Sequence, residues 1–171
     1  MNDTKPFVAV LMGSDSDLAT MQGCIDVLRK LEVVCEVRIT SAHRTPEATR
    51  DYVLDAERRG CAVFIAAAGM AAHLAGAVAA QTLRPVIGVP IDAGPLKGLD
   101  ALLSTVQMPA GVPVASVAIG SAGAKNAGFL AAQMLGVAVP GLHERLRSER
   151  AASAEGVAAK NDALQQKLEA G

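Results

Sequence analysis

A histidine and an arginine stand side by side at positions 43 and 44, in a polar segment that also holds Ser41 and Thr45. The imidazole of a histidine exchanges protons near neutral pH. The guanidinium of Arg44 presents a planar fork of donors that matches a phosphate or a carboxylate, and the two hydroxyls add donors beside it. His43 and Arg44 therefore predict proton transfer next to an anion. The alternative is a solvated polar loop without a ligand.

A second polar segment, Leu-Met-Gly-Ser-Asp-Ser-Asp, ends an apolar run and begins a helix-like pattern. Such a turn commonly holds phosphate, because free backbone N–H groups and the helix dipole favour negative charge. A carboxylate at Asp17 repels phosphate but accepts hydrogen bonds from hydroxyls, so this turn suits a sugar better. It lacks the glycine pattern of dinucleotide sites and the lysine of a P-loop. Alternatively, Ser14 and Asp17 form a capping box that only satisfies backbone N–H groups.

A second histidine, His73, stands in the segment Ala-Ala-Ala-Gly-Met-Ala-Ala-His-Leu-Ala-Gly-Ala-Val-Ala-Ala. Small side chains expose the backbone and admit a ligand close to the chain. Such a wall would be both close and dry. The alternative for His73 is a hydrogen-bonded structural histidine without a ligand.

The spacing of other reactive residues excludes two classes of site. The three histidines do not pair with cysteines or carboxylates at metal-ligand spacings, and no Cys-x-x-Cys occurs, so no metal site is expected. The Gly-x-Ser-x-Gly motif of serine hydrolases is also missing.

The elements that must position these residues alternate along the chain. Strand patterns lie at 7–12, 33–39, 61–68, 85–89 and 112–119. Helix patterns lie at 15–31, from 46 onward, and at 71–81 and 122–135, and a loop and helix lie over 95–106. This alternation predicts right-handed βαβ units and an α/β fold: a three-layer, flavodoxin-like parallel sheet with strand order 2-1-3-4-5. The polar loops after the first three strands then share one rim of the sheet, where such folds bind ligands.

Residues 141–171 are polar and helical, with no strand partner. They predict a C-terminal helical appendage that packs on a neighbouring subunit or frays. The expected organisation is one catalytic domain over residues 1–140 and a tail over residues 141–171.

Composition limits the partners and the location of the chain. Of its 171 residues, 51% are hydrophobic. The chain has 16 Lys and Arg and 17 Asp and Glu, so no excess of positive charge that would attract nucleic acid is expected. The apolar runs near 61–69 and 74–80 are interrupted by Gly and His, which argues against a membrane span. Three cysteines in strand- or helix-like runs, and no leader pattern, predict reduced thiols and a cytoplasmic protein.

Four spaced motifs resemble those of the bacterial N5-carboxyaminoimidazole ribonucleotide mutases of purine biosynthesis. They cover residues 12–17, 41–46, 71–74, and 98–100 through 106–109, in unbroken order between about Val8 and Leu135. The resemblance implies a flavodoxin-like homo-octamer without a metal or organic cofactor. It implies transfer of a carboxylate from the exocyclic nitrogen to ring carbon 4 of an aminoimidazole ribonucleotide.

The resemblance also implies roles for individual residues. His43 matches the proton-transfer residue. The positions that match the nucleotide-binding residues, or lie with them, are Ser14, Asp17, Ser41 and Arg44. The positions that match the wall near the imidazole are Gly69, Ala71, Ala72, His73 and Leu74.

Three positions depart from the pattern of the family, and two alternatives for the function stay open. Met70 stands where a second glycine is frequent, and Ala75 and Ala77 replace a proline and a methionine. All three keep the wall apolar. A sister class, which carboxylates the aminoimidazole with free carbon dioxide, has lysine after the corresponding histidine, so Arg44 favours the mutases. A non-catalytic nucleotide-binding module is the other alternative.

Overall fold

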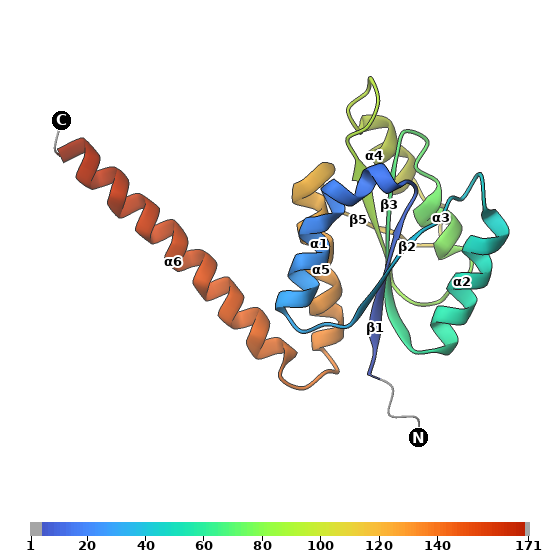
Figure 1. Ribbon diagram of the computed structural model, residues 1–171, viewed down its shortest axis with the longest axis horizontal. Coiled ribbons are helices and arrows are strands. Elements are labelled where there is room, and N and C mark those ends of the chain that lie inside the picture. The colour runs from blue at the N-terminus through green and yellow to red at the C-terminus, as the bar shows by residue number, and fades with distance from the viewer. Residues whose placement is uncertain (1–4, 170–171) are drawn as a thin grey trace.

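The computed structural model describes residues 5–169 and contains a five-stranded parallel sheet with the order β2-β1-β3-β4-β5 (Figure 1). The predicted strand order is confirmed. The strands are β1 (Phe7–Met12), β2 (Cys35–Ile39), β3 (Cys61–Gly69), β4 (Val86–Ile91) and β5 (Ala115–Ser116). The helices are the 3-10 turn η1 (Asp15–Asp17), α1 (Leu18–Lys30), α2 (Pro46–Arg58), α3 (Leu74–Ala79), α4 (Leu99–Val106), α5 (Gly120–Gly136) and α6 (Leu142–Glu169).

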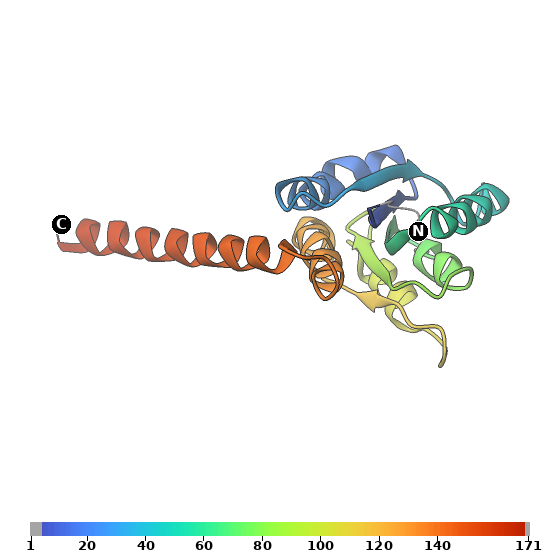
Figure 2. The ribbon, with the colours of Figure 1, turned by 90° about the horizontal axis from the view of Figure 1, so that it is seen from below.

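Helices cover both faces of the sheet, which gives the three predicted layers (Figure 2). Helices α1 and α5 pack on one face, and α2, α3 and α4 pack on the other. Strand β1 is buried along its whole length, with Val8 and Val10 in the first core and Ala9 and Leu11 in the second. Burial on both faces explains why the β1 sequence is a continuous apolar run rather than an alternating one.

Strand β5 is much shorter than the sequence pattern over residues 112–119 predicts. Only Ala115 and Ser116 pair with β4. The chain before them turns, with Val112 N–H donating to Pro109 O at 3.2 Å, and Pro113 has no N–H to contribute to a ladder. Residues 112–119 have the composition of a strand, but only residues 115–116 join the sheet, as its edge strand.

The predicted helix at 71–81 also begins later than expected. Helix α3 starts at Leu74, because residues 70–73 form tight turns in which backbone N–H groups bond to carbonyls two residues earlier. Helix α4 starts at Leu99, after Gly98 in a left-handed conformation with φ of +86°. This start fits the loop and helix predicted over residues 95–106, whereas the late start of α3 lengthens the loop after β3 at the carboxyl rim of the sheet.

The C-terminal appendage is present as helix α6, which projects away from the rest of the molecule (Figure 1). Its first turns are anchored, since Leu142 is buried and the Arg145 Nε donates to Leu31 O at 2.8 Å. Lys30 and Glu149 add an ion pair at 2.7 Å, whereas every described residue after Arg150 is exposed. The division at residue 140 stays a prediction. Within residues 5–169, no helix combines the length and apolar character needed to cross a membrane.

Candidate active site

The loops after β1, β2 and β3 meet at the carboxyl rim of the sheet, where two side-chain contacts join them. The Arg44 guanidinium donates from Nη2 to Gly13 O at 3.1 Å, which ties the β2 loop to the β1 loop. His43 Nε2 lies 2.7 Å from His73 Nδ1, which ties the β2 loop to the β3 loop. The structure therefore brings together residues up to 60 positions apart in the chain, as the strand order requires.

The two histidine rings meet edge to face, with centroids 4.8 Å apart and an interplanar angle of 77°. In the neutral pair one of the two bonded nitrogens carries the hydrogen and the other accepts it. His73 is thus hydrogen-bonded, as the structural alternative requires. Its partner, however, is the residue predicted to transfer protons, so His73 influences the orientation and tautomer of His43. The sequence offers no signal for this contact beyond the adjacency of the loops.

The β1 loop contains the predicted capping box. Ser14 N–H donates to Asp17 Oδ2 at 3.1 Å, and Ser16 N–H donates to Ser14 Oγ at 3.3 Å. Asp17 is only 6% exposed. Burial raises the pKa of this carboxyl above its usual value, although hydrogen bonds from Ser14 N–H and the Ser16 hydroxyl oppose the shift. The capping alternative is confirmed for this structure, in which Asp17 Oδ1 also accepts from the Ser16 hydroxyl at 3.4 Å, so both carboxylate oxygens hold a hydrogen bond within the loop.

Hydroxyl groups hold the β2 loop in shape. Ser41 Oγ accepts from Arg44 N–H at 3.1 Å, and Thr45 Oγ1 accepts from Ser41 N–H at 3.0 Å. Below them, the buried hydroxyls of Thr40 and Thr49 lie 2.6 Å apart. Sequence reasoning missed the Thr40–Thr49 pair and assigned Thr45 to the anion. The Thr-x4-Thr-x3-Thr spacing was the available signal, because threonines near a helix start commonly bond to the backbone.

The wall predicted from the β3 loop divides into exposed and buried positions. Ala71 and His73 are exposed, Gly69 is half-buried, and Ala72 and Leu74 are each 2% exposed. The Leu74 side chain belongs to the core between the sheet and α3. Leu74 and Ala72 are thus buried behind the exposed positions of this loop.

No group of three or more His, Cys, Asp and Glu side chains that could hold a metal ion occurs among residues 5–169. The chemistry available at the rim is instead one imidazole pair, one guanidinium and one capped carboxylate, which suit proton transfer on an anionic, hydroxyl-bearing ligand.

Comparison with known proteins identifies relatives that match most of the chain. The family model described as AIR carboxylase matches residues 7–156. The N5-carboxyaminoimidazole ribonucleotide mutase of Mycobacterium tuberculosis is 55% identical over 161 residues, covering 94% of this chain and 91% of the relative. The Bacillus subtilis mutase is 48% identical over 160 residues, covering 94% and 99%. The crystal structure of Treponema denticola PurE matches with a TM-score of 0.83 and 26% identity, covering 92% and 98%. The chain belongs to the AIR carboxylase family.

Proposed function

We propose that the protein is an N5-carboxyaminoimidazole ribonucleotide mutase of de novo purine biosynthesis. It converts N5-carboxyaminoimidazole ribonucleotide into 4-carboxy-5-aminoimidazole ribonucleotide. The observation that carries the proposal is the contact of His43 with His73 on the same rim as Arg44 and Asp17, in a chain 55% identical to a mutase. A cytoplasmic location follows from this metabolic role.

The charges of the rim suggest how the substrate is oriented. Arg44 binds the phosphate, because its fork matches phosphate oxygens. Asp17 accepts hydrogen bonds from the ribose hydroxyls, with Ser14 and Ser41 beside them. The aminoimidazole ring of the substrate then lies near His43 and His73, against the wall of Gly69, Ala71 and Ala72.

The proposed reaction needs a dry pocket and one group that gives a proton and takes one back. The bond from the exocyclic nitrogen to the carboxylate breaks, its electron pair stays on the nitrogen, the protonated imidazole of His43 gives that nitrogen a proton, and carbon dioxide is released beside carbon 4. Carbon 4 attacks the carbon dioxide and becomes tetrahedral. His43, now neutral, removes the proton from carbon 4, which restores both the aromatic ring and the protonated imidazole. Electrons move in pairs within the substrate, so neither a metal nor an organic cofactor is required.

An activity assay with two substrates tests the proposal. Purified protein is supplied either with N5-carboxyaminoimidazole ribonucleotide or with aminoimidazole ribonucleotide and bicarbonate, and formation of the 4-carboxy product is followed. Fast turnover of the first substrate is expected. Fast turnover of only the second would identify a carboxylase instead. Tight binding without product from either would identify a non-catalytic nucleotide-binding module.

Replacing Asp17 by Asn should separate stability from binding. The folded-state pKa of Asp17 is raised, so the charged carboxylate destabilises the fold at neutral pH, and this effect disappears as the pH falls through the raised pKa. The Asp17→Asn variant should therefore have a thermal midpoint at pH 7 that is unchanged or higher, with a difference from wild type that shrinks in acid. Loss of a charged acceptor for the ribose should raise KM about tenfold. An unchanged KM would remove Asp17 from the ribose site.

We also propose that the chain assembles as a homo-octamer in which the tail packs on neighbouring subunits. Large apolar side chains are exposed on α6 at Val157, Leu164 and Leu168 and on α4 at Leu99 and Leu103. On α6 the three residues are spaced by seven and four positions, so they share one face of the helix, and exposed apolar stripes of this kind are typical of interfaces. The domain of residues 1–140 would then carry the catalytic groups and the tail would serve assembly.

Truncation of the tail tests this assembly. Ending the chain at Arg150 removes only residues that are exposed in the structure where it describes them, so the domain should keep its thermal midpoint. Light scattering should give an octamer for the full chain and a smaller mass for the truncated chain. An octamer of unchanged mass without residues 151–171 would show that the tail is not an assembly element.

A further inference from the structure

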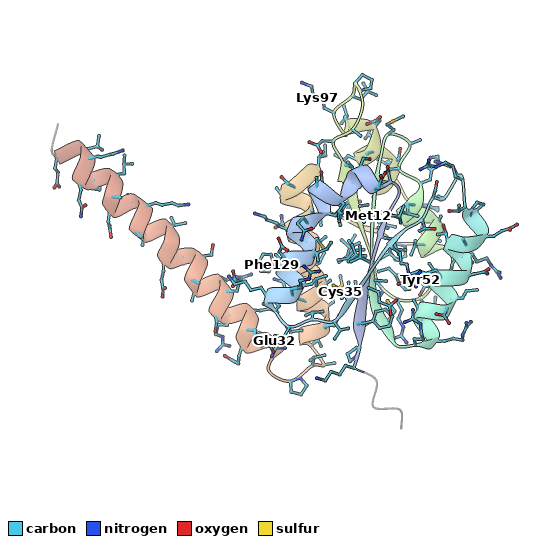
Figure 3. All side chains as sticks on the ribbon, viewed as in Figure 1. Met12, Glu32, Cys35, Tyr52, Lys97 and Phe129 are labelled. Atoms are coloured by element: carbon cyan, nitrogen blue, oxygen red, sulfur yellow. The ribbon has the colours of Figure 1, made fainter. Side chains whose placement is uncertain are left out.

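Helices α1 and α5 and the base of α6 enclose a groove of about 1110 Å³ that contains no residue of the candidate site. Its floor is apolar, because Val27 of α1 and Phe129 and Leu130 of α5 pack against the core and stay half-buried (Phe129 is labelled in Figure 3). The α6 side of the groove runs from His143 to Ser153. An apolar floor with charged edges is typical of a surface that a partner covers.

The distal part of α6 carries an apolar stripe that no other described element covers. Val157, Leu164 and Leu168 share one face of the helix and are 66%, 52% and 67% exposed. Figures 1 and 2 show this part of α6 projecting from the molecule. Most helices in proteins owe their stability to the packing of an apolar face, so the stripe requires a partner surface.

The stripe matches the groove in length, and the two belong to different copies of the chain. From Val157 to Leu168 the helix rises about 16 Å, and from His143 to Ser153 it rises about 15 Å. Helix α6 is continuous from Leu142 to Glu169, so the stripe of one chain does not reach the groove of the same chain. Two copies related by a two-fold axis, with their α6 helices antiparallel, would each place a stripe in the groove of the other.

The charges of the two surfaces are complementary. The groove is lined by four cationic side chains and two carboxylates, at Lys30, Lys125, Arg147, Arg150, Asp26 and Glu149. Beyond Ser153 acidic side chains outnumber basic ones, with Glu155, Asp162 and Glu169 against Lys160 and Lys167. The C-terminal end of the helix adds the negative pole of its dipole. A groove with excess positive charge therefore suits this segment better than another tail would.

We propose that residues 154–168 of one copy dock in the groove of a second copy, which returns the same contact. The inference rests on the assembly proposed above and deepens it by naming the surface on which the tail docks. The matched family model ends at residue 156, so the stripe lies beyond the part of the chain that this model covers.

Disulfide cross-linking tests the docking. The full-length protein carries Gln133→Cys in the groove and Leu164→Cys on the stripe, is treated with oxidised glutathione, and is separated on a non-reducing denaturing gel. The matched control combines Gln133→Cys with Gln166→Cys, an exposed position on the other side of α6. About tenfold more cross-linked dimer is expected than in the control, because docking raises the effective concentration of the two thiols.

The native cysteines should contribute little background to this experiment. Burial raises the pKa of Cys24 to about 12 and that of Cys61 to about 11, and it also raises the pKa of the Cys35 thiol. The reactive thiolate is therefore scarce at all three native positions near neutral pH. Wild type, treated in the same way, measures the remaining background.

The other outcomes would each overturn the docking. These are equal cross-linking in the variant and the control, no cross-link in either, a dimer from Leu164→Cys alone, which would show that tails pair with each other, and a disulfide within one chain. Light scattering of wild type separates this inference from the assembly. An octamer without the expected cross-link would refute the docking alone, whereas a monomer would refute the proposed assembly and the docking with it.

Discussion

Replacing His43 by Asn should reduce kcat by about 10²–10⁴-fold, the usual contribution of a general acid or base. Asparagine is similar in size and can still exchange a hydrogen bond with His73, but it does not titrate, so carbon 4 keeps its proton and the ring is not restored. Ribonucleotide binding should change little, because Arg44 and Asp17 are untouched. Steady-state kinetics and calorimetric titration with the product measure the two quantities separately.

Two further histidine variants serve as a control and a comparison for this result. His143→Asn, at an exposed position at the start of α6, should leave kcat unchanged. His73→Asn should lower kcat by less than His43→Asn does, because His73 acts on the reacting atoms through the 2.7 Å contact with His43. Strong residual turnover in His43→Asn would contradict the role given to that residue. Equal losses in both variants would mean that the pair acts as one unit.

The arrangement of the sheet was predictable because it depends on patterns that a sequence displays. Strand β1 was predicted with its observed bounds, since a continuous apolar run stops at Gly13. The strand order followed from the alternation of strands and helices. Strand β5 was predicted too long, because the β-branched residues near Val112 and Val114 have strand composition, while the turn at Pro109 and Pro113 decides their conformation.

The candidate site was predictable as a set of adjacent loops but not as a set of contacts. Parallel strands bring their carboxyl-terminal loops together whatever the side chains are. The His43–His73 hydrogen bond depends instead on the rotamers of two side chains, and the turn before His73 depends on a left-handed φ at Met70 that residue preferences argue against. Such features arise from tertiary packing, so local sequence patterns do not contain them.

Replacing Arg44 by Met should raise KM about 10²-fold, because charge-assisted hydrogen bonds to a phosphate contribute about 1.5–3 kcal/mol. The side chain is exposed, and the hydrogen bond that it donates to Gly13 O links the β2 loop to the β1 loop. Lysine keeps the charge but not the planar fork, so Arg44→Lys should have an intermediate KM. The kcat of both variants should fall less than their KM rises, since the phosphate is remote from carbon 4.

A thermodynamic cycle that combines Arg44→Met with removal of the phosphate from the substrate tests whether Arg44 binds that phosphate. Wild type should lose affinity when the phosphate is removed, and Arg44→Met should show little further loss, because the two changes delete the same interaction. Arg50→Met, an exposed position on α2, removes one positive charge outside the loop and should leave KM unchanged. If the losses from Arg44→Met and from phosphate removal add, the two groups do not interact. The anion would then have to be held by backbone N–H groups of the β1 turn, in which the Asp17 carboxylate already occupies Ser14 N–H.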